Sequence, residues 1–356
     1  MQARKSFFAK WFNTIFILSC FFIFAYPAGR LSYWSFHHAG LSIVIAIVSW
    51  VLTVVAARHA FSGPKMKIRY LVVHWMGASY ILASFTLVAD IVRIFVTVED
   101  AVAIVAVLIA TLASIFVAIL ISHHLAVKVL TISSPKIDRP YRIVQISDVH
   151  IGSRQKGFML RIVNKINSLK PDFIVITGDL IDSSAVNIDA LESIRQLDAV
   201  TLFSIGNHER YSDLAKVITM ADQLGMITLR QESYHSDTLS FSGIDDADDA
   251  NQVALHLPGI SPDITKFNVL LYHRPVGWES AIDHGIDLML SGHTHNGQIF
   301  PFNWVVKQQF SRIAGLYTQG DSRLYVSSGT GTWGPLMRLG SLNEVTLFDL
   351  VPESGQ

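Results

Sequence analysis

The order of apolar and polar positions divides the chain into two parts. The first part contains four long apolar stretches, and a helix needs about 20 such residues to cross a bilayer. These stretches are Phe12–Tyr26, Leu41–Ala57, Tyr70–Ala89 and Ala101–Ile121. The pattern predicts four membrane-spanning helices, the first two completed by their flanking residues. A cleaved signal peptide is the alternative for the first stretch, but Pro27 and its bulky neighbours make a poor cleavage site.

From Tyr141 onward the pattern changes to short apolar runs that alternate at first with helix-like segments. Eight runs predict strands: Arg142–Ile146, Phe173–Thr177, Val200–Ile205, Leu239–Ser242, Val269–Tyr272, Asp287–Leu290, Leu324–Ser327 and Val345–Leu350. Helical periodicity is expected over Gly157–Leu169, Ile188–Leu197 and Asp213–Leu224. Ser133, Ser134, Pro135 and Pro140 are interpreted as a linker out of the membrane. The sequence therefore predicts a transmembrane domain over residues 1–126 and a layered α/β domain over residues 127–356.

Charge follows the same division. Charged residues make up only 16% of the chain, and residues 1–126 carry nine basic and three acidic side chains. Residues 127–356 carry nineteen basic and twenty-five acidic side chains. The formal net charge of zero is therefore the sum of a basic first part and an acidic second part. An acidic soluble part lacks the positive surface that nucleic acid requires, which excludes nucleic acid as the main partner. A lipid membrane is the expected partner, and the oligomeric state is not indicated.

The distribution of lysine and arginine predicts which side of the membrane holds the soluble domain. Basic residues gather before the first apolar stretch, between the second and third, and after the fourth. The opposite loops hold only Arg30 and Arg93. Both ends of the chain and the soluble domain are therefore expected in the cytoplasm. Asp90 and Arg93 lie three residues apart and are expected to pair with each other.

Polar side chains that can bind metal follow five of the expected strands. Ligands in open α/β sheets gather where strands end, because the loops converge there. The donors are Asp148 and His150, Asp179 and Asp182, Asn207 and His208, His273, and His293 and His295. Each fragment alone is typical of an ordinary turn or a structural histidine. Together they supply the oxygen and imidazole donors of a divalent-metal site.

These motifs resemble the calcineurin-like metallophosphoesterases. The strings are SDVHIG (147–152), GDLID (178–182), GNHE (206–209), YHRP around His273, and GHTH (292–295). The resemblance covers about residues 127–350 and is strongest to membrane-tethered bacterial members, which Glu344 and the stretch 334–338 also fit. It implies a four-layer αββα sandwich. Asn296 departs from the pattern, because many relatives have glycine there, and its side chain is expected to narrow or polarise the entrance to the site.

The resemblance also implies a dinuclear site with a defined set of ligands. It places Asp148, His150 and His295 on one ion, Asn207, His273 and His293 on the other, and Asp179 between the two. Nitrogen and oxygen donors suit manganese, iron or zinc better than magnesium or calcium, and manganese is the expected ion. Two carboxylates leave a pair of divalent ions with net positive charge, which favours a phosphate substrate.

Further roles come from the same resemblance. His208 is expected to protonate the leaving oxygen rather than to bind metal, and Asp182 to fix its tautomer and raise its pKa. Arg338 and Arg274 are candidates for binding a substrate phosphate, with a surface position as the equal alternative for Arg274.

The expected activity is hydrolysis of a phosphate ester or pyrophosphate bond by a multi-pass protein of the bacterial inner membrane. Four spans exceed what a simple tether needs, which favours an amphiphilic, lipid-linked substrate. Some relatives cleave UDP-2,3-diacylglucosamine in lipid A biosynthesis, and this is the leading specific candidate. The alternatives are a phosphodiesterase or phosphatase of soluble nucleotides with a membrane anchor, and a membrane sensor or scaffold with a vestigial phosphoesterase domain.

Overall fold

The computed structural model describes residues 18–61 and 66–353. Its internal contacts divide the chain into two compact units, Met1–Ile119 and Leu120–Gln356, and each is described by itself. The first unit is helical, and the second is an α/β unit. The domain boundary expected after residue 126 stays a prediction.

The first unit contains the membrane-length helices. They are α3 (Ala39–Phe61), α4 (Met66–Phe95) and α5 (Asp100–His123), and α2 (Tyr26–Phe36) precedes them. Among the described residues, Ala39–Ala60, Ile68–Phe95 and Asp100–His123 are long and apolar enough to cross a bilayer. The first expected span, Phe12–Tyr26, begins outside the described residues. Three apolar helices are therefore present, and the expected count of four is not confirmed.

Helix α2 continues past Pro27 to Phe36, where a loop was expected. A π-helical turn, η1 (Phe21–Ala25), comes directly before it. Such local adjustments let a membrane helix accommodate a proline that cannot donate a backbone hydrogen bond. This extension places Arg30 on a helix rather than in a loop.

The expected pair between Asp90 and Arg93 is wrong. Arg30 Nε donates to Asp90 Oδ2 at 2.8 Å, and the hydroxyl of Tyr26 donates to the same oxygen at 2.6 Å. Arg93 instead pairs with Asp100, at 2.5 Å. Charges in apolar surroundings need partners. The partner of Asp90 is Arg30 on the extended α2, and not Arg93 on the next turn of α4.

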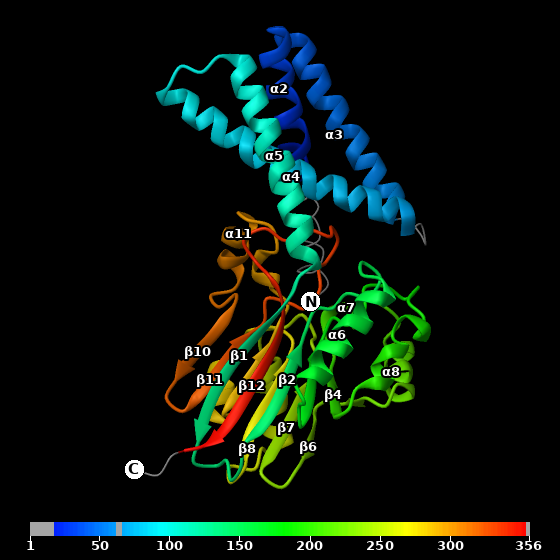
Figure 1. Cartoon of the computed structure of the whole chain (residues 1–356), viewed down its shortest axis with the longest axis vertical. Coiled ribbons are helices and arrows are strands. Elements are labelled where there is room, and N and C mark those ends of the chain that lie inside the picture. Colours follow the sequence, from blue (N-terminus) through cyan, green and yellow to red (C-terminus); the bar gives the residue numbers. More distant parts are fainter. Residues whose placement is uncertain (1–17, 62–65, 354–356) are drawn as a thin grey trace. The chain divides into compact units, whose positions relative to one another are not determined.

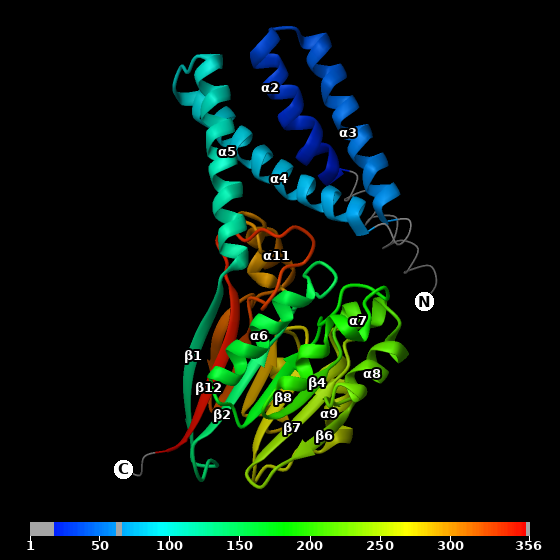
Figure 2. The same cartoon turned by 45° about the vertical axis from the view of Figure 1, so that its right-hand side comes forward.

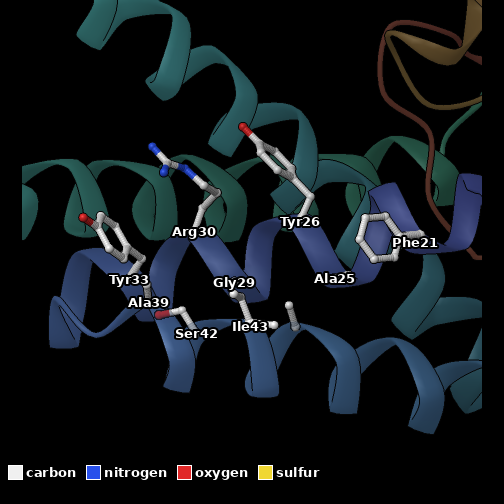
Figure 3. A pocket seen from close by; sticks show the side chains of 10 residues that line it. Phe21, Ala25, Tyr26, Gly29, Arg30, Tyr33, Ala39, Ser42 and Ile43 are labelled. Carbon is white, nitrogen blue, oxygen red and sulfur yellow. The ribbon is translucent and has the colours of Figure 1, made fainter.

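A shallow apolar cavity of about 320 Å³ lies between α2 and α3 (Figure 3). Gly29 lets the helices approach closely, because a Cβ there would lie 3.1 Å from that of Ala46. Tyr26 and Arg30 are also among the lining residues, and both bond Asp90 on α4. The other lining residues include the small or apolar Phe21, Ala25, Gly29, Ala39, Ile43 and Ala46.

The second unit is built on two six-stranded mixed sheets (Figure 1). Sheet 1 has the order β1 (Leu125–Ser134), β12 (Asn343–Pro352), β2 (Tyr141–Ile146), β3 (Phe173–Thr177), β4 (Val200–Ser204) and β5 (Ile227–Thr228). Sheet 2 has the order β10 (Gly315–Gln319), β11 (Ser322–Val326), β9 (Leu288–Ser291), β8 (Phe267–Tyr272), β7 (Leu239–Ile244) and β6 (Glu232–His235). Strands β2 to β5 are parallel, as are β7, β8, β9 and β11.

Three clusters of buried apolar side chains lie between the layers of this unit. One lies between sheet 1 and helices α6 (Lys156–Ser168) and α8 (Leu214–Gln223), which cover that sheet in Figure 2. The second lies between the two sheets, and the third between sheet 2 and helices α9 (Gln252–Ile260) and α10 (Trp278–Asp283). The remaining helices are α7 (Asn207–Tyr211), η4 (His295–Gly297) and α11 (Phe302–Gln309). The expected α/β class is confirmed.

Two sequence expectations differ from the structure here. Ile188–Leu197 forms the short 3₁₀ turns η2 (Ile188–Ala190) and η3 (Glu192–Gln196) instead of an α-helix. Its apolar residues, Ile188, Leu191, Ile194 and Leu197, recur every three residues, which is the period of a 3₁₀-helix. Ser133 and Ser134, which were expected in a linker, are the last two residues of strand β1, which pairs in parallel with β12 over its whole length.

The strand register places the end of α5 and the ends of the parallel strands at one edge. Strand β1 starts directly after α5, with Leu125 opposite Asn343 at the start of β12. Strand β2 runs antiparallel to β12, so its end at Ile146 lies near that same start. The loops that follow β2, β3 and β4 therefore emerge where the chain leaves α5.

Candidate metal centre

All seven expected ligands come from loops at the ends of five parallel strands. Asp148 and His150 follow β2, Asp179 follows β3, Asn207 follows β4, His273 follows β8, and His293 and His295 follow β9. The two sheets bring these loops together, since β3 and β4 face β8 across the central cluster. The structure thus gathers the donors that the strand ends predicted.

One group of donors contains Asp148, His150 and His295. His150 Nε2 lies 3.0 Å from His295 Nε2, and His295 Nε2 lies 3.4 Å from Asp148 Oδ1. Ligands about 2.0–2.2 Å from one ion lie roughly 3–3.6 Å apart at tetrahedral or octahedral angles. These three side chains therefore fit around a single divalent ion.

The second group is centred on His273. Its Nε2 lies 3.1 Å from Asn207 Oδ1, 3.2 Å from His293 Nδ1 and 3.2 Å from Asp179 Oδ2. These distances fit a second ion for the same reason. Asp179 Oδ2 is also 3.9 Å from His150 Nε2, so this carboxylate lies between the two groups.

The charge of the site favours cations. Burial opposes a positive charge on His273, but the neighbouring Asp179 raises its pKa to about 10. Burial likewise opposes a charge on His150, but the nearby Asp182 outweighs this effect and raises the pKa of His150 to about 9. Burial would raise the pKa of Asp179, yet the charge of His273 holds it well below the usual range. Buried carboxylates here attract positive charge, so the donor set fits two metal ions.

Unfavourable backbone conformations are concentrated at the metal ligands. Asp148, His150, Asp179, His293 and His295 all have φ between 50° and 72°. Non-glycine residues adopt this left-handed conformation rarely, and such residues cluster at functional sites. Asn296, with φ of 50°, occupies a position that glycine and asparagine adopt at least cost, which explains the departure noted in the sequence.

Close packing also demands glycine beside the ligands. A Cβ at Gly292 would lie 2.2 Å from Asp148 Oδ2, and one at Gly178, which has φ of +83°, would lie 2.6 Å from His273 Nδ1. Both motif glycines therefore leave room for the ligand of a neighbouring loop.

Hydrogen bonds outside the ligand set fix two imidazole tautomers. His273 Nδ1 donates to the carbonyl of Thr177 at 2.8 Å, and His150 Nδ1 donates to Asp182 Oδ1. Carbonyl and carboxylate oxygens only accept here, so Nε2 of each ring keeps its lone pair for a metal ion.

Asp182 therefore accepts its shorter hydrogen bond from His150, and His208 lies farther from it. His208 Nδ1 lies 3.3 Å from the same Asp182 oxygen, and 17% of the His208 side chain is exposed. Burial lowers the pKa of His208, and Asp179 and Asp182 do not outweigh it. Asp182 acts to raise this pKa, as expected, but burial of the ring outweighs it and the net shift is downward.

The two candidate substrate arginines are already bound to the protein. Arg338 is 0% exposed, and its guanidinium donates to the carbonyls of His295, Gly329 and Gly331 at 3.2, 3.2 and 2.7 Å. This geometry supports the metal loops rather than contact with a substrate. Arg274 pairs with Asp246 at 2.6 Å and also with Asp248, in keeping with the structural alternative.

Glu209 is a supporting residue that the sequence analysis missed. It is buried, and its two carboxylate oxygens accept four backbone N–H groups, those of Asp179, Leu180, Ile181 and Gly206. Burial and Asp179 raise its pKa to about 7, against these hydrogen bonds. A glutamate three residues after the N-cap Gly206 is the capping-box signal that could have identified it.

A chain of buried hydrogen bonds joins the end of α5 to the metal loops. The carbonyl of Ser122 accepts from Arg154 Nη2 at 2.5 Å and from Asn343 Nδ2 at 2.6 Å. Asn343 Oδ1 accepts from Arg338 Nε at 2.7 Å, and Arg338 binds the His295 carbonyl. The last turn of α5 is thus part of the framework that holds His295.

Glu209→Gln should destabilise the α/β unit. The amide retains the size of the side chain but loses one acceptor oxygen, leaving about two buried N–H groups unpaired. We expect the free energy of unfolding to fall by about 2–4 kcal/mol, measured by urea denaturation. Glu192→Gln removes an exposed pair with Arg195 and should cost less than about 0.5 kcal/mol. Equal effects for the two variants would contradict the assigned role of Glu209.

Arg338→Lys should weaken metal binding at His295. Lysine keeps the charge but cannot span three carbonyls, so loss of this outer support should lower metal affinity about 10–100-fold. Metal titration of the full chain measures this, and the group around His273 should keep its ion. Unchanged metal binding with a raised KM would instead support direct contact between Arg338 and substrate.

Comparison with known proteins agrees with these motifs. Residues 141–297 match the calcineurin-like phosphoesterase family. A metallophosphoesterase of Campylobacter jejuni is 32% identical over 237 residues, covering 63% of this chain and 63% of that protein. A transmembrane protein with metallophosphoesterase domain from Bos taurus is 36% identical over 234 residues, covering 58% and 52%.

A metallophosphoesterase of Aquifex aeolicus is 29% identical over 248 residues, covering 64% of this chain and 93% of that protein. This chain spans less than two thirds of the length of the Campylobacter and bovine proteins. The matched residues contain the motifs that end β2, β3, β4, β8 and β9. Residues 141–297 of this chain are therefore a calcineurin-like metallophosphoesterase domain.

Proposed function

We propose that the chain is a membrane-bound, metal-dependent phosphoesterase that hydrolyses a phosphate ester or pyrophosphate bond. The observation that carries the proposal is the position of Asp179 between two groups of metal donors, with His208 directly beside them. This arrangement is what a two-metal hydrolysis requires. No expected ligand is missing, which argues against a vestigial domain.

The ions would be held by the seven ligands, and manganese is the proposed ion, with iron or zinc as alternatives. When bound, they supply Lewis acidity toward the phosphate oxygens and the attacking water. The protein's own contribution is electrostatic. Asp148 and Asp179 neutralise only part of the metal charge, while the imidazoles and the amide of Asn207 add bonds without adding negative charge.

His208 is proposed to give a proton to the leaving oxygen. Its backbone N–H donates to Asp179 Oδ1 at 2.9 Å, which fixes the ring close to both groups of donors. Its Nδ1 faces Asp182, so Nε2 is the atom available to the substrate. Burial of the ring lowers its pKa, so the protonated ring is a stronger acid but is populated at lower pH than an ordinary histidine.

The substrate is proposed to be amphiphilic and to reach the site from the membrane. Three apolar helices support a membrane association, and the donor loops emerge at the sheet edge where the chain leaves α5. UDP-2,3-diacylglucosamine is a specific candidate, and a soluble nucleotide ester is the competing one. We place the catalytic domain on the cytoplasmic side of a bacterial inner membrane, from the distribution of basic residues.

His208→Ala should slow hydrolysis mainly for poor leaving groups. A missing acid should cost about 10²–10⁴-fold on diphenyl phosphate, and far less on bis(p-nitrophenyl) phosphate, whose leaving group needs no proton. Steady-state kinetics and elemental analysis of the bound metals check this. His235→Ala, on β6 away from the donors, is the matched control. Equal losses on both esters, or loss of both metals, would contradict the role.

The full-length protein in vesicles should hydrolyse bis(p-nitrophenyl) phosphate with manganese and lose this activity on chelation. Activity should return when manganese is restored, because the ligands themselves are unchanged. Failure with every divalent metal would favour the scaffold alternative. A panel of lipid-linked phosphates and soluble nucleotides, analysed by mass spectrometry, then separates the amphiphilic substrate from the soluble one.

A further inference from the structure

An exposed apolar patch lies at the sheet edge that carries the metal loops. We define it by Phe300, Phe302, Trp304, Val305, Trp333 and Leu342, whose exposed fractions are 45, 45, 60, 58, 57 and 47%. Three of them belong to helix α11, which has no buried residue at all. Contiguous exposed apolar side chains of this size mark an interaction surface.

The patch is one surface, because its two segments are hydrogen-bonded together. Gln298 Nε2 donates to the Trp333 carbonyl at 3.0 Å, and the Trp333 N–H donates back to Gln298 Oε1 at 2.9 Å. The Phe300 N–H donates to the Leu339 carbonyl at 2.8 Å. The rings of Phe300 and Trp304 lie 5.2 Å apart. Phe300 thus connects the α11 side of the patch to the 333–342 segment.

The second segment is also bonded to the last turn of α5. Ser122 Oγ donates to the Leu336 carbonyl at 3.0 Å, and Asn343 binds the Ser122 carbonyl. Helix α5 has the composition of a membrane span up to His123. This apolar range ends next to Ser122, and the patch is part of the same hydrogen-bonded framework as Ser122. Figures 1 and 2 both show α11 at the end of the sheets where β1 begins.

Charge around the patch favours anionic lipid head groups. From Leu288 to Asn343 the sequence has a single acidic residue, Asp321, although the rest of the soluble part is acidic. Asp321 lies in the β10–β11 hairpin, which precedes β11 and so lies away from the loops that follow that strand. Lys307 is exposed on α11, one turn after Trp304. Tryptophan, phenylalanine and lysine together are typical of helices that lie in a membrane interface.

We propose that the apolar patch docks onto the lipid bilayer, with α11 lying in the head-group layer. Trp333 then joins this surface to the site, since its ring lies 6.0 Å from that of His208. A lipid-linked phosphate could pass from the head-group layer to the donors without crossing water. This consequence for the substrate rests on the proposed function, whereas the docking itself does not depend on catalysis.

Spin-label accessibility in the full chain tests the docking. The variant Val305→Cys in a Cys20→Ala background is labelled with a nitroxide and placed in vesicles of phosphatidylcholine with a minority of phosphatidylglycerol. Oxygen concentrates in lipid and a nickel chelate in water. We expect the oxygen-to-nickel accessibility ratio at residue 305 to be several-fold higher than at the control, Ile264→Cys in the same background. Ile264 is 71% exposed and precedes β8, at the sheet edge opposite the donors.

Three outcomes are possible, and each decides the question. High oxygen with low nickel accessibility at residue 305 supports docking onto lipid. High nickel accessibility shows that the patch faces water and overturns the proposal. Low accessibility to both reagents shows that protein covers the patch, from the helical unit or a second copy, and also overturns it. Because no activity is measured, a failure here is distinct from a failure of the proposed phosphoesterase function.

Discussion

The gathering of two buried carboxylates and four imidazoles at one point is the constraint on which this α/β unit depends. Asp148 is completely buried and Asp179 nearly so, and unpaired charges are costly in such surroundings. Against the opposing effect of burial, the neighbouring carboxylates raise the pKa of His150 and His273, which shows that the site attracts positive charge. The donor distances fit two cations, which would bind the neutral rings and balance this charge. Five ligands also hold left-handed backbone conformations that are unfavourable in isolation. The parallel strands and their packed loops must supply the free energy that keeps this arrangement together.

Two buried charged side chains contribute much of that support, and both act on backbone groups. Glu209 accepts N–H groups from the loops after β3 and β4, while Arg338 donates to carbonyls beside His295 and after β11. One is an anion that binds donors, and the other is a cation that binds acceptors. A single charged group can bind several loops at once because it offers several strong hydrogen bonds in fixed directions. Neither needs to touch a substrate to be essential for the site.

The structure brings together the residues that the sequence predicted as metal ligands, whereas their supporting partners were not predicted, and the difference has a physical basis. Asp148 or His293 follows a short apolar strand, so local pattern and turn chemistry suffice to place it at a strand end. Arg338 carries no such local signal, and its partners lie in loops far away along the chain. The same holds for Arg30, which meets Asp90 only after α2 extends past Pro27. Strand β1 was overlooked because it begins at Leu125, immediately beyond the apolar helix that ends at His123, although four of its ten residues are exposed in alternation. Long-range pairing decided each of these cases.

The register of β1, β12 and β2 places the end of α5 at the sheet edge that carries the metal loops. Because β1 is parallel to β12 and β12 is antiparallel to β2, the residue that follows α5 and the loop that carries Asp148 emerge at the same edge. The opposite direction for β1 would place the donors a full strand length from the end of α5. Ser122 then reaches Arg338 through Asn343, so the terminal turn of the helix and the metal loops share one hydrogen-bonded framework. A tether alone would need no such framework, since a flexible linker holds a domain near a membrane equally well. Within the α/β unit, these bonds hold the segment around Ser122 against the loop that carries His295.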